Sequence, residues 1–368
     1  MLLHYCFYNT NRISTNISSE RYISTENMLP NKGGVCEAAN VPSGTVIEYK
    51  VGDILISNIR PYFQKIWRAD RNGGCSADVL CIRAKENVDS KYLYYLLSQQ
   101  AFFDYVMSGA KGCKMPRGDK KQIMQWPVTL PPLDEQRRIA GILGALDDKI
   151  ELNRRINANL EAQAQALFRS WFVDNDKQLG NYQTKSLTDI AQYLNGLAMQ
   201  KFPPESIQNS LPVLKIKELG QGLCDASSDR CSTSIKPEYV INDGDVIFSW
   251  SGTLLVDVWC GGKCGLNQHL FKVTSDNYPK WFIFYWTKHH LDKFIRIAKD
   301  KAVTMGHIKR CDLESSEVKV PEKPILEYLD KIFTPLFDSM IAHRIENRKL
   351  SALRDTLLPK LMAGEINC

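Results

Sequence analysis

Two segments of the chain carry positive charge at a density suited to neutralising phosphate groups. Residues 111–121 read KGCKMPRGDKK and residues 296–310 read RIAKDKAVTMGHIKR, and each segment holds five cations and one anion. Lysine and arginine at this density provide the sequence-independent part of nucleic-acid binding. Any one of these lysines taken alone could equally be a solvated surface residue, so the match between the two segments carries the interpretation. The candidate phosphate ligands are Lys111, Lys114, Arg117, Lys120, Lys121, Lys299, Lys301, Lys309 and Arg310.

A protein that reads bases also needs amide, guanidinium or hydroxyl groups that reach the base edges in a groove. Groups of these types lie near the expected ends of strands in both halves of the chain. The candidate base readers are Arg60, Gln64, Arg68, Ser251, Thr253, Asn267, Gln268, Thr304 and His307. Glycines at 252, 265 and 306 would let the backbone approach a ligand closely. We expect Trp67, Trp250 and Trp259 to pack in the core or at its rim rather than to stack on bases.

The sequence contains none of the motifs that would predict catalysis or a metal site. It has no GxxxxGK[ST] phosphate loop, no Asn-Pro-Pro-aromatic motif of adenine methylation and no HExxH. The acidic run Asp134-Glu135 falls in the first turn of an expected helix, where it complements the helix dipole. The spacing of Cys224, Cys231, Cys260 and Cys264 does not match a paired CxxC zinc site, so these residues are expected to be ordinary thiols.

Composition places the chain among globular proteins. Its 368 residues are enough for two or three domains, with 44% hydrophobic and 24% charged residues and a formal net charge of +6. This mild excess of positive charge is compatible with a polyanionic partner. The N-terminus has no basic region ahead of an apolar run, and the longest apolar run, Trp281 to Trp286, is far too short for a membrane span. We therefore expect a cytoplasmic protein with reduced cysteines.

The chain repeats itself once, at a nearly constant separation along the sequence. Gly52-Asp53-Ile54-Leu55 reappears as Gly244-Asp245-Val246-Ile247, and each run opens an apolar stretch typical of a buried strand. The aromatic segments 92–103 and 282–294 are expected to be core helices. Met115 and Met305 in the two basic segments have nearly the same separation as the two glycine runs. The agreement of these separations indicates a tandem duplication whose contents have diverged.

Each half closes with a long segment whose apolar residues recur at coiled-coil spacing. The expected seam positions are Ile139, Leu143, Leu146, Ile150, Asn153, Asn157, Leu160, Leu167, Leu329, Ile332, Leu336, His343, Leu350, Leu353 and Leu357. Polar seam residues such as Asn153 and Asn157 specify register at a cost in stability. Pro335 is expected to kink the second helix or to break off its first turns. The two helices are expected to pack antiparallel, although the same pattern would also serve simple dimerisation.

These observations predict an α+β fold with two tandem α/β domains separated by two long antiparallel coiled-coil helices, in a pseudo-two-fold repeat. The expected domains are residues 1–130 and 184–321, and the expected helices are residues 131–174 and 322–368. The second domain opens with KSLTDIAQYLNG (185–196), whereas the separation between the two methionines places the equivalent segment at or before Met1. The first domain is therefore expected to lack its opening element.

Several of these segments resemble a known family. LPPLDEQRRIAGIL (130–143) and LRDTLLPKLMAGEI (353–366) resemble the conserved regions of Type I restriction-modification specificity subunits. GDILISNIRPYFQKIW (52–67) and CGLNQHLFKV (264–273) resemble parts of the target recognition domains of that family. The resemblance extends over nearly the whole chain; the helix motifs are specific to the family and the domain motifs only to subclasses of it.

The resemblance implies a non-catalytic, DNA-binding subunit of a restriction system. It would read a bipartite, asymmetric DNA site, one half per target recognition domain, and carry two methyltransferase and two restriction (motor-nuclease) subunits. S-adenosylmethionine, ATP and Mg²⁺ would be bound by those partners, which perform the DNA methylation and the cleavage. Two alternatives remain at this point: a stand-alone DNA methyltransferase or nuclease with diverged motifs, and a coiled-coil adaptor without DNA affinity.

Overall fold

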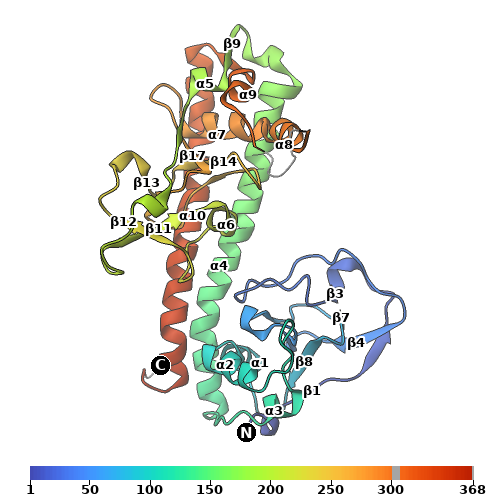
Figure 1. Ribbon diagram of the computed structural model, residues 1–368. Helices are drawn as coiled ribbons and strands as arrows, with labels where there is room; N and C mark the ends of the chain where they lie inside the picture. Colours follow the sequence, from blue (N-terminus) through green and yellow to red (C-terminus); the bar gives the residue numbers. More distant parts are fainter. Residues whose placement is uncertain (301–306, 367–368) are drawn as a thin grey trace. The chain divides into compact units, whose positions relative to one another are not determined.

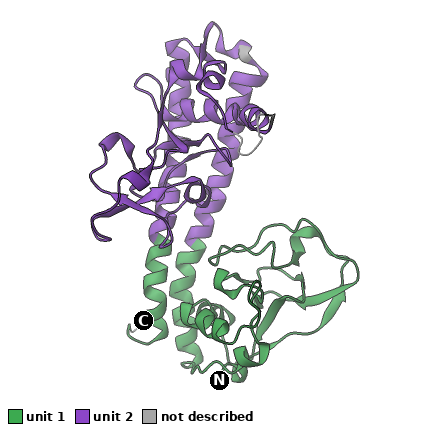
Figure 2. Ribbon diagram, in the orientation of Figure 1, with its two compact units in different colours: residues 1–148, 350–368 green, residues 149–349 purple. Residues whose placement is uncertain are grey.

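The protein divides into two compact units that share two long helices. The structure is a computed structural model that describes residues 1–300 and 307–366. Unit 1 comprises residues 1–148 and 350–368, and unit 2 comprises residues 149–349 (Figure 2). The long helices α4 (Leu133–Phe168) and α10 (Lys323–Met362) are labelled in Figure 1, and each contributes one segment to unit 1 and another to unit 2 (Figure 2). A short π-helical stretch, Arg169–Asp174, follows α4.

Unit 1 contains two four-stranded sheets and three short helices. The first sheet has the order β1 (Cys6–Tyr8), β8 (Val79–Ala84), β5 (Ile54–Ser57), β6 (Ile66–Arg68), and all its pairs are antiparallel. The second has the order β2 (Arg12–Ser14), β4 (Thr45–Tyr49), β7 (Gly73–Cys75), β3 (Tyr22–Ile23). The helices are α1 (Ser90–Leu97), α2 (Gln100–Ser108) and α3 (Lys120–Met124).

Unit 2 repeats this arrangement and adds to it. Its first sheet has the order β10 (Gln192–Asn195), β17 (Leu270–Thr274), β14 (Val246–Ser249), β15 (Leu255–Val258). Its second has the order β12 (Arg230–Ser232), β11 (Ser210–Leu214), β16 (Cys264–Leu266), β13 (Val240–Ile241). A further ladder joins β9 (Tyr182–Ser186) to β18 (Glu317–Pro321). The helices are α5 (Leu187–Ile190), α6 (Ile216–Gln221), α7 (Lys280–His289), α8 (Leu291–Asp300) and α9 (Arg310–Glu314).

The central strand of each first sheet, β5 in unit 1 and β14 in unit 2, is buried on both faces, which explains its apolar sequence. In unit 1, Ile54 and Ile56 join the core formed with α1 and α2, whereas Leu55 faces the second sheet. In unit 2, Phe248 joins the core that contains α7, and Ile247 faces the second sheet. Each unit therefore has helices, one sheet and a second sheet in successive layers.

The duplicated turn before these strands is reproduced in its hydrogen bonds. Gly52 has φ +90° and Gly244 has φ +87°, a left-handed conformation that favours glycine. In each turn the carboxylate of the next residue, Asp53 or Asp245, accepts a hydrogen bond of 2.8 Å from the backbone N–H three residues before it. The tandem α/β repeat expected from the sequence is confirmed.

The opening element of unit 1 is present, so the expectation that it is missing is wrong for most of its length. Leu187 N donates to Ser316 O in unit 2, and Leu2 N donates to Trp126 O in unit 1. The strands that follow, β10 and β1, pair with the equivalent strands β17 and β8. The equivalent residues Leu2 and Leu187 are separated by fewer residues than the equivalent residues Met115 and Met305. The two separations differ because loops between these positions have different lengths in the two units. A fixed separation therefore placed the segment too early.

The two aromatic segments each form two helices rather than one. The chain turns at Ser98 and Gln99 between α1 and α2, and at His290 between α7 and α8. Ser98 Oγ donates to the Tyr94 carbonyl oxygen at 2.7 Å, a local hydrogen bond that competes with helix continuation. The turn lets Phe102 and Phe103 of the second helix reach the same core as α1.

The segments of α4 and α10 in unit 2 pack antiparallel around a polar layer. Asn153 is completely buried and its Nδ2 donates to Glu346 Oε2 at 2.6 Å and to Asn347 Oδ1 at 2.9 Å. One turn further along α4, Asn157 Oδ1 lies 2.9 Å from Nδ1 of His343. Residue numbers rise along one helix as they fall along the other, which establishes the antiparallel direction.

The inward face of α10 differs from the seam expected for it. Leu353 is 47% exposed, whereas Phe333, Phe337 and Leu358 are almost completely buried. The expected positions Ile332, Leu336 and Leu357 lie one residue before these and are only half-buried. An α-helix drifts relative to a strict seven-residue repeat, and α10 also packs on the sheets beside it, so its buried face is displaced. The remaining expected positions are buried or half-buried: Ile139, Leu143, Leu146, Ile150, Asn153, Asn157, Leu160, Leu167, Leu329, His343 and Leu350.

Pro335 does not break the second helix. α10 continues through it from Lys323 to Met362, and the proline side chain is exposed. The expectation that the first turns would break away is therefore wrong. Packing of Leu329, Phe333 and Phe337 in the unit 2 core holds the helix on both sides of the lost backbone hydrogen bond.

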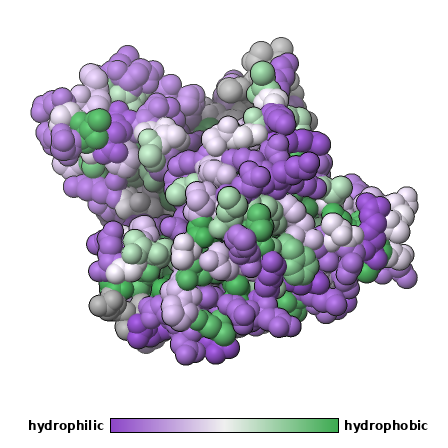
Figure 3. Space-filling view, turned by 90° about the horizontal axis from the view of Figure 1, so that it is seen from below, coloured by the Kyte–Doolittle hydropathy of each residue, from purple (hydrophilic) through white to green (hydrophobic). Residues whose placement is uncertain are grey.

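The surface is largely hydrophilic on the face drawn in Figure 3, where hydrophobic side chains appear in several groups set among polar residues. Among the residues that the structure describes, there is no helix with the length and apolar character that crossing a bilayer requires.

Two arginines of α10 fasten the sheets of unit 2 to the helix. Arg344 Nη1 and Nη2 donate to the two carboxylate oxygens of Asp257 on β15, at 2.8 and 2.7 Å. Arg348 binds Asp243 in the same two-pronged way, at 2.7 and 2.8 Å. Such paired hydrogen bonds fix orientation as well as distance. The Arg348 guanidinium lowers the pKa of Asp243 below its ordinary value of 3.8.

We predict that Arg348→Ala lowers the free energy of unfolding by about 1.5–3 kcal/mol at pH 7, because Asp243 loses a charged partner. The folded state holds the pKa of Asp243 below its unfolded value, so the stabilisation is complete above pH ~4 and is lost as the pH falls through the folded pKa. Urea unfolding at pH 7 and at pH 3 measures both effects.

The matched control is Lys323→Ala, which removes a highly exposed pair with Glu327 at 3.8 Å. It should change the free energy of unfolding by less than about 0.5 kcal/mol. Equal effects of the two substitutions would contradict the fastening role of Arg348.

Candidate nucleic-acid interface

In both units the loop that leaves the central strand pairs with a residue of the basic segment. Ile59 and Arg117 form an isolated antiparallel bridge in unit 1, and Ser251 and His307 form one in unit 2. The next residues along repeat the match, since Gly118 N donates to Asn58 O and Ile308 N donates to Trp250 O. The duplicated fold therefore brings candidate base readers and candidate phosphate ligands to the same end of the sheet in each unit.

The basic loop of unit 1 is exposed and only partly neutralised. Arg117 Nη2 lies 3.2 Å from Asp78 Oδ1, and Lys111 Nζ lies 3.3 Å from Asp119 Oδ2. Backbone N–H groups of Gln122 and Lys121 donate to Asp119 and lower its pKa, so this carboxylate stays charged at the N-terminus of α3. The exposed Lys114, Lys120 and Lys121 have no carboxylate partner within the described ranges. These three charges remain available to an anionic ligand.

The candidate readers of unit 1 fall into two groups. Arg60 and Gln64 flank a short 3₁₀ turn after β5, and the backbone N–H of Arg60 donates to Pro116 O at 2.8 Å beside the basic loop. Arg68 lies at the other end of the hairpin, opposite Ile54, and donates to Ser90 Oγ at 3.1 and 3.2 Å. Since β5 alone spans about 10 Å, the structure does not bring Arg68 to the site formed by the other two.

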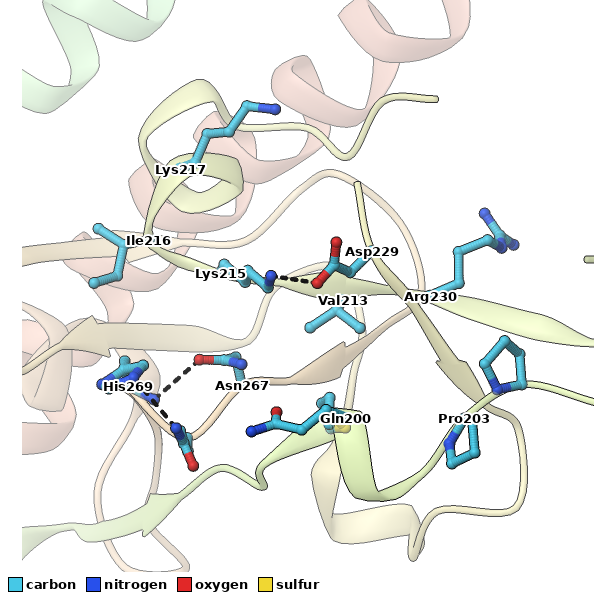
Figure 4. Close-up of a pocket in the computed structure, with 13 residues that line it drawn as sticks. Gln200, Pro203, Val213, Lys215, Ile216, Lys217, Asp229, Arg230, Asn267 and His269 are labelled. Carbon is cyan, nitrogen blue, oxygen red and sulfur yellow. Dashed lines mark hydrogen bonds and ion pairs between the residues drawn. The ribbon is translucent and has the colours of Figure 1, made fainter. Parts of the chain in front are cut away.

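The readers of unit 2 surround a histidine that the sequence analysis did not single out. His269 Nδ1 lies 3.0 Å from Ser251 Oγ. The backbone N–H of His269 donates to Asn267 Oδ1 at 3.2 Å, as Figure 4 shows. Asn267 and Ser251 are both buried, and they contact the backbone and the ring of His269, respectively. Gln268 is half-buried next to the ring, whereas Thr253 is exposed and separate from this cluster.

A groove of about 620 Å³ continues from His269 across the second sheet of unit 2. Gln200, Lys215, Lys217 and Arg230 line it from the other side (Figure 4). Lys215 pairs with Asp229, and Lys217 Nζ lies 3.0 Å from Ser227 Oγ. These residues were missed because they come from separate strands and loops. Only the local pattern Lys215-Ile216-Lys217 after a strand would have indicated them.

The other candidate phosphate ligands of unit 2 that the structure describes belong to the basic segment 296–310 and are exposed. Lys299 lies on α8, and Lys309 and Arg310 lie at the start of α9 with Arg310 Nε 3.5 Å from Glu314 Oε1. His307 is exposed and its ring lies 6.4 Å from that of Trp250. Lys301, Thr304 and Gly306 lie outside the described residues.

Glycines and tryptophans near the site have structural roles. A Cβ atom at Gly265 would lie 2.6 Å from Cys231 Sγ, so a close approach within the protein requires this glycine. Gly252 has φ +65° in the loop after β14. Trp259 is completely buried, and Trp67 and Trp250 are partly buried against their neighbours.

The four cysteines considered for zinc are free thiols. Burial raises the pKa of Cys260 to about 11, which disfavours the thiolate that a metal needs. Within residues 1–300 and 307–366 no three histidine, cysteine or acidic side chains are grouped to hold a metal ion.

Comparison with known proteins gives consistent matches over nearly the whole chain. The sequence model of the family described as "Type I restriction modification DNA specificity domain" matches residues 4–162 and again residues 180–349. The MjaIX specificity subunit of a Type I restriction enzyme from Methanocaldococcus jannaschii is 27% identical, over 77% of this chain and 70% of its own. The HindI specificity subunit from Haemophilus influenzae is 23% identical, over 94% of each chain.

A solved structure has the same fold. The crystal structure of a Type I restriction-modification S subunit from M. genitalium covers 98% of this chain and 94% of its own, with a TM-score of 0.57 and 14% identity.

We predict that replacing Lys114 and Arg117 together by alanine weakens DNA binding on every sequence. Each lost phosphate contact should reduce the slope of log K against log salt by about 0.9. Titration of the full chain, with any assembly partner it requires, against duplex DNA at several salt concentrations measures the slope.

Lys331→Ala, an exposed lysine on α10, serves as the control and should leave the slope unchanged. A wild-type slope in the double variant would exclude this loop from the interface.

Proposed function

Because the chain belongs to the Type I restriction modification DNA specificity domain family, we propose that it is the DNA-reading subunit of such a restriction system. Residues 1–130 and 184–321 act as target recognition domains. Each reads one half of a bipartite, asymmetric DNA site. The helices in residues 131–174 and 322–368 are the conserved coiled-coil regions.

One observation carries this proposal: the same backbone bridge in both units presents different side chains. The bridge joins Ile59 to Arg117 in unit 1 and Ser251 to His307 in unit 2. Two copies of one fold that present different side chains suit a DNA site whose two halves have different sequences. Phosphate contacts position such a protein, and base contacts specify the sequence.

Partners supply the chemistry in this proposal. Two methyltransferase subunits and two restriction subunits assemble on the chain, and S-adenosylmethionine, ATP and Mg²⁺ are bound by them. Exposed apolar side chains on the long helices support such docking, namely Ile142 and Leu353 in unit 1 and Leu152 in unit 2. The assembly works in the cytoplasm, where the DNA of a prokaryotic cell lies.

Mapping of methylated adenines across the genome, in cells that carry or lack this gene, tests the function. We expect a split motif that is methylated only in carriers. Exchange of residues 184–321 for the equivalent domain of another family member should alter one half of that motif and preserve the other. An exchange that altered both halves would contradict the assignment of one half-site to each unit.

The alternative of a stand-alone methyltransferase is tested with the purified chain. We expect no transfer of labelled methyl groups from S-adenosylmethionine to DNA by the chain alone, because we assign the methyl-donor site to a partner. Addition of the methyltransferase subunit should restore transfer. Turnover by the chain alone would replace our proposal with the stand-alone enzyme.

A further inference from the structure

Two loops of unit 1 interlock in an unusual backbone conformation. Asn31, Lys32, Arg60 and Gln64 have φ between 50° and 60°, and within the described ranges they are the non-glycine residues with positive φ. The loops are joined to each other, since Asn31 N donates to Phe63 O at 2.8 Å and Lys32 N donates to Gln64 O at 3.0 Å. Such conformations persist only where the surrounding structure holds them, and they gather at functional sites.

The turn between Arg60 and Gln64 is also fastened from other sides. Pro61 is buried, and Arg60 N donates to Pro116 O at 2.8 Å. Gln64 Nε2 donates to Gln100 Oε1 at 2.5 Å, which ties the turn to α2. The turn is thus held rigidly in position before any ligand binds.

This rigid turn displays two aromatic rings to solvent. Tyr62 is 48% exposed and Phe63 is 37% exposed, and their ring centroids are 4.7 Å apart. The Tyr62 hydroxyl has no hydrogen-bond partner in the part of the chain that the structure describes. Unlike a single exposed ring, two neighbouring rings on a rigid turn form a contiguous apolar surface that a partner can contact.

The surroundings of the rings favour DNA as that partner. The basic loop lies directly beside the turn, through the bond from Arg60 to Pro116 and the bridge between Ile59 and Arg117. Among the residues that the structure describes, the buried Arg60 Nε has no hydrogen-bond partner. Aromatic rings between cations match the alternation of bases and phosphates along a strand.

The aromatic turn is not part of the duplicated fold. The equivalent loop of unit 2, residues 250–254, is shorter than residues 58–65, and its one aromatic residue, Trp250, donates from Nε1 to Asn195 Oδ1 at 2.9 Å. Residues that the fold does not need in both copies are free to serve the specific task of one unit.

We propose that Tyr62 and Phe63 form a wedge that enters a base step of the half-site read by unit 1 and stacks on the unstacked bases. This inference rests on the proposed DNA-reading function and deepens it. Apolar and aromatic side chains that enter a step unstack it and kink the duplex, and flexible pyrimidine–purine steps yield most readily. The wedge would therefore select a deformable step without hydrogen bonds to its bases.

Fluorescence of 2-aminopurine tests the wedge. Duplexes carry the probe at successive positions of the unit 1 half-site, excluding the adenine that is methylated, and bind the full chain with its methyltransferase partner. We expect a rise in fluorescence at one step. Tyr62→Ala and Phe63→Ala should each remove the rise and weaken specific binding by about 5- to 100-fold. Tyr62→Phe should retain both, since stacking does not need the hydroxyl.

The control is Phe7→Ala, which removes a ring 43% exposed on β1. It should leave the fluorescence and the affinity unchanged. DNA binding by the wild type with no rise at any step would overturn the wedge and leave the proposed function intact. Alanine variants that keep the fluorescence but lose the methyltransferase partner would instead make the turn a protein-docking site, and would also overturn the wedge. Failure of the wild-type complex to bind DNA at all would count against the proposed function itself.

Discussion

The register between α4 and α10 depends on one buried amide. Asn153 is completely buried in unit 2 and its Nδ2 donates to Glu346 and Asn347, while its Oδ1 has no hydrogen-bond partner among the described residues. A shift in register would break these two hydrogen bonds, and a buried amide left without them costs about 1–3 kcal/mol. The helices therefore have one stable alignment. That alignment directs Arg344 and Arg348, one turn apart, toward the sheets of unit 2, and so the position of β14 and its reading loop depends on it.

The two copies retain what folding needs and differ where the chain meets solvent. The turn that contains Asp53 or Asp245 keeps its hydrogen bonds because it starts a strand buried on both faces. Beyond the strand ends this constraint disappears. Three strands of the second sheet are equivalent in the two units: β3, β7 and β4 in unit 1, and β11, β16 and β13 in unit 2. The fourth strand lies at opposite edges of these three, since β2 pairs with β4 in unit 1 and β12 pairs with β11 in unit 2. A change of edge leaves the buried layers intact and changes the surface beside the reading loops.

Sequence patterns predicted the parts of the fold that depend on local periodicity. The apolar runs before Ser57 and Ser249, the long helices and the duplication all leave regular patterns in the chain. The sequence did not predict contacts made by residues far apart along it: His269 meets Ser251 only through strand pairing, and Arg68 donates to Ser90. The displaced seam of α10 has a similar cause, because neighbouring sheets decide which face is buried. Distances in sequence therefore predicted which loops and basic segments lie together in each unit but not the contacts of their individual side chains.

The divergence of the copies extends into the core, and a pair of equivalent tyrosines shows how each unit adapts. In unit 1, Tyr95 OH donates to Asp147 at 2.6 Å, and Arg354 of α10 binds the same carboxylate. The equivalent residue of unit 2 is Tyr285, whose buried hydroxyl has no hydrogen-bond partner in the described ranges of the chain. A lost buried hydrogen bond of this kind costs about 1–3 kcal/mol. Unit 2 has in its place the paired hydrogen bonds of Arg344 and Arg348 to its sheets. In unit 1 the arginine–carboxylate pair thus joins α10 to Asp147 of α4, whereas in unit 2 the pairs join α10 to the sheets, so the two units make different contacts along α10.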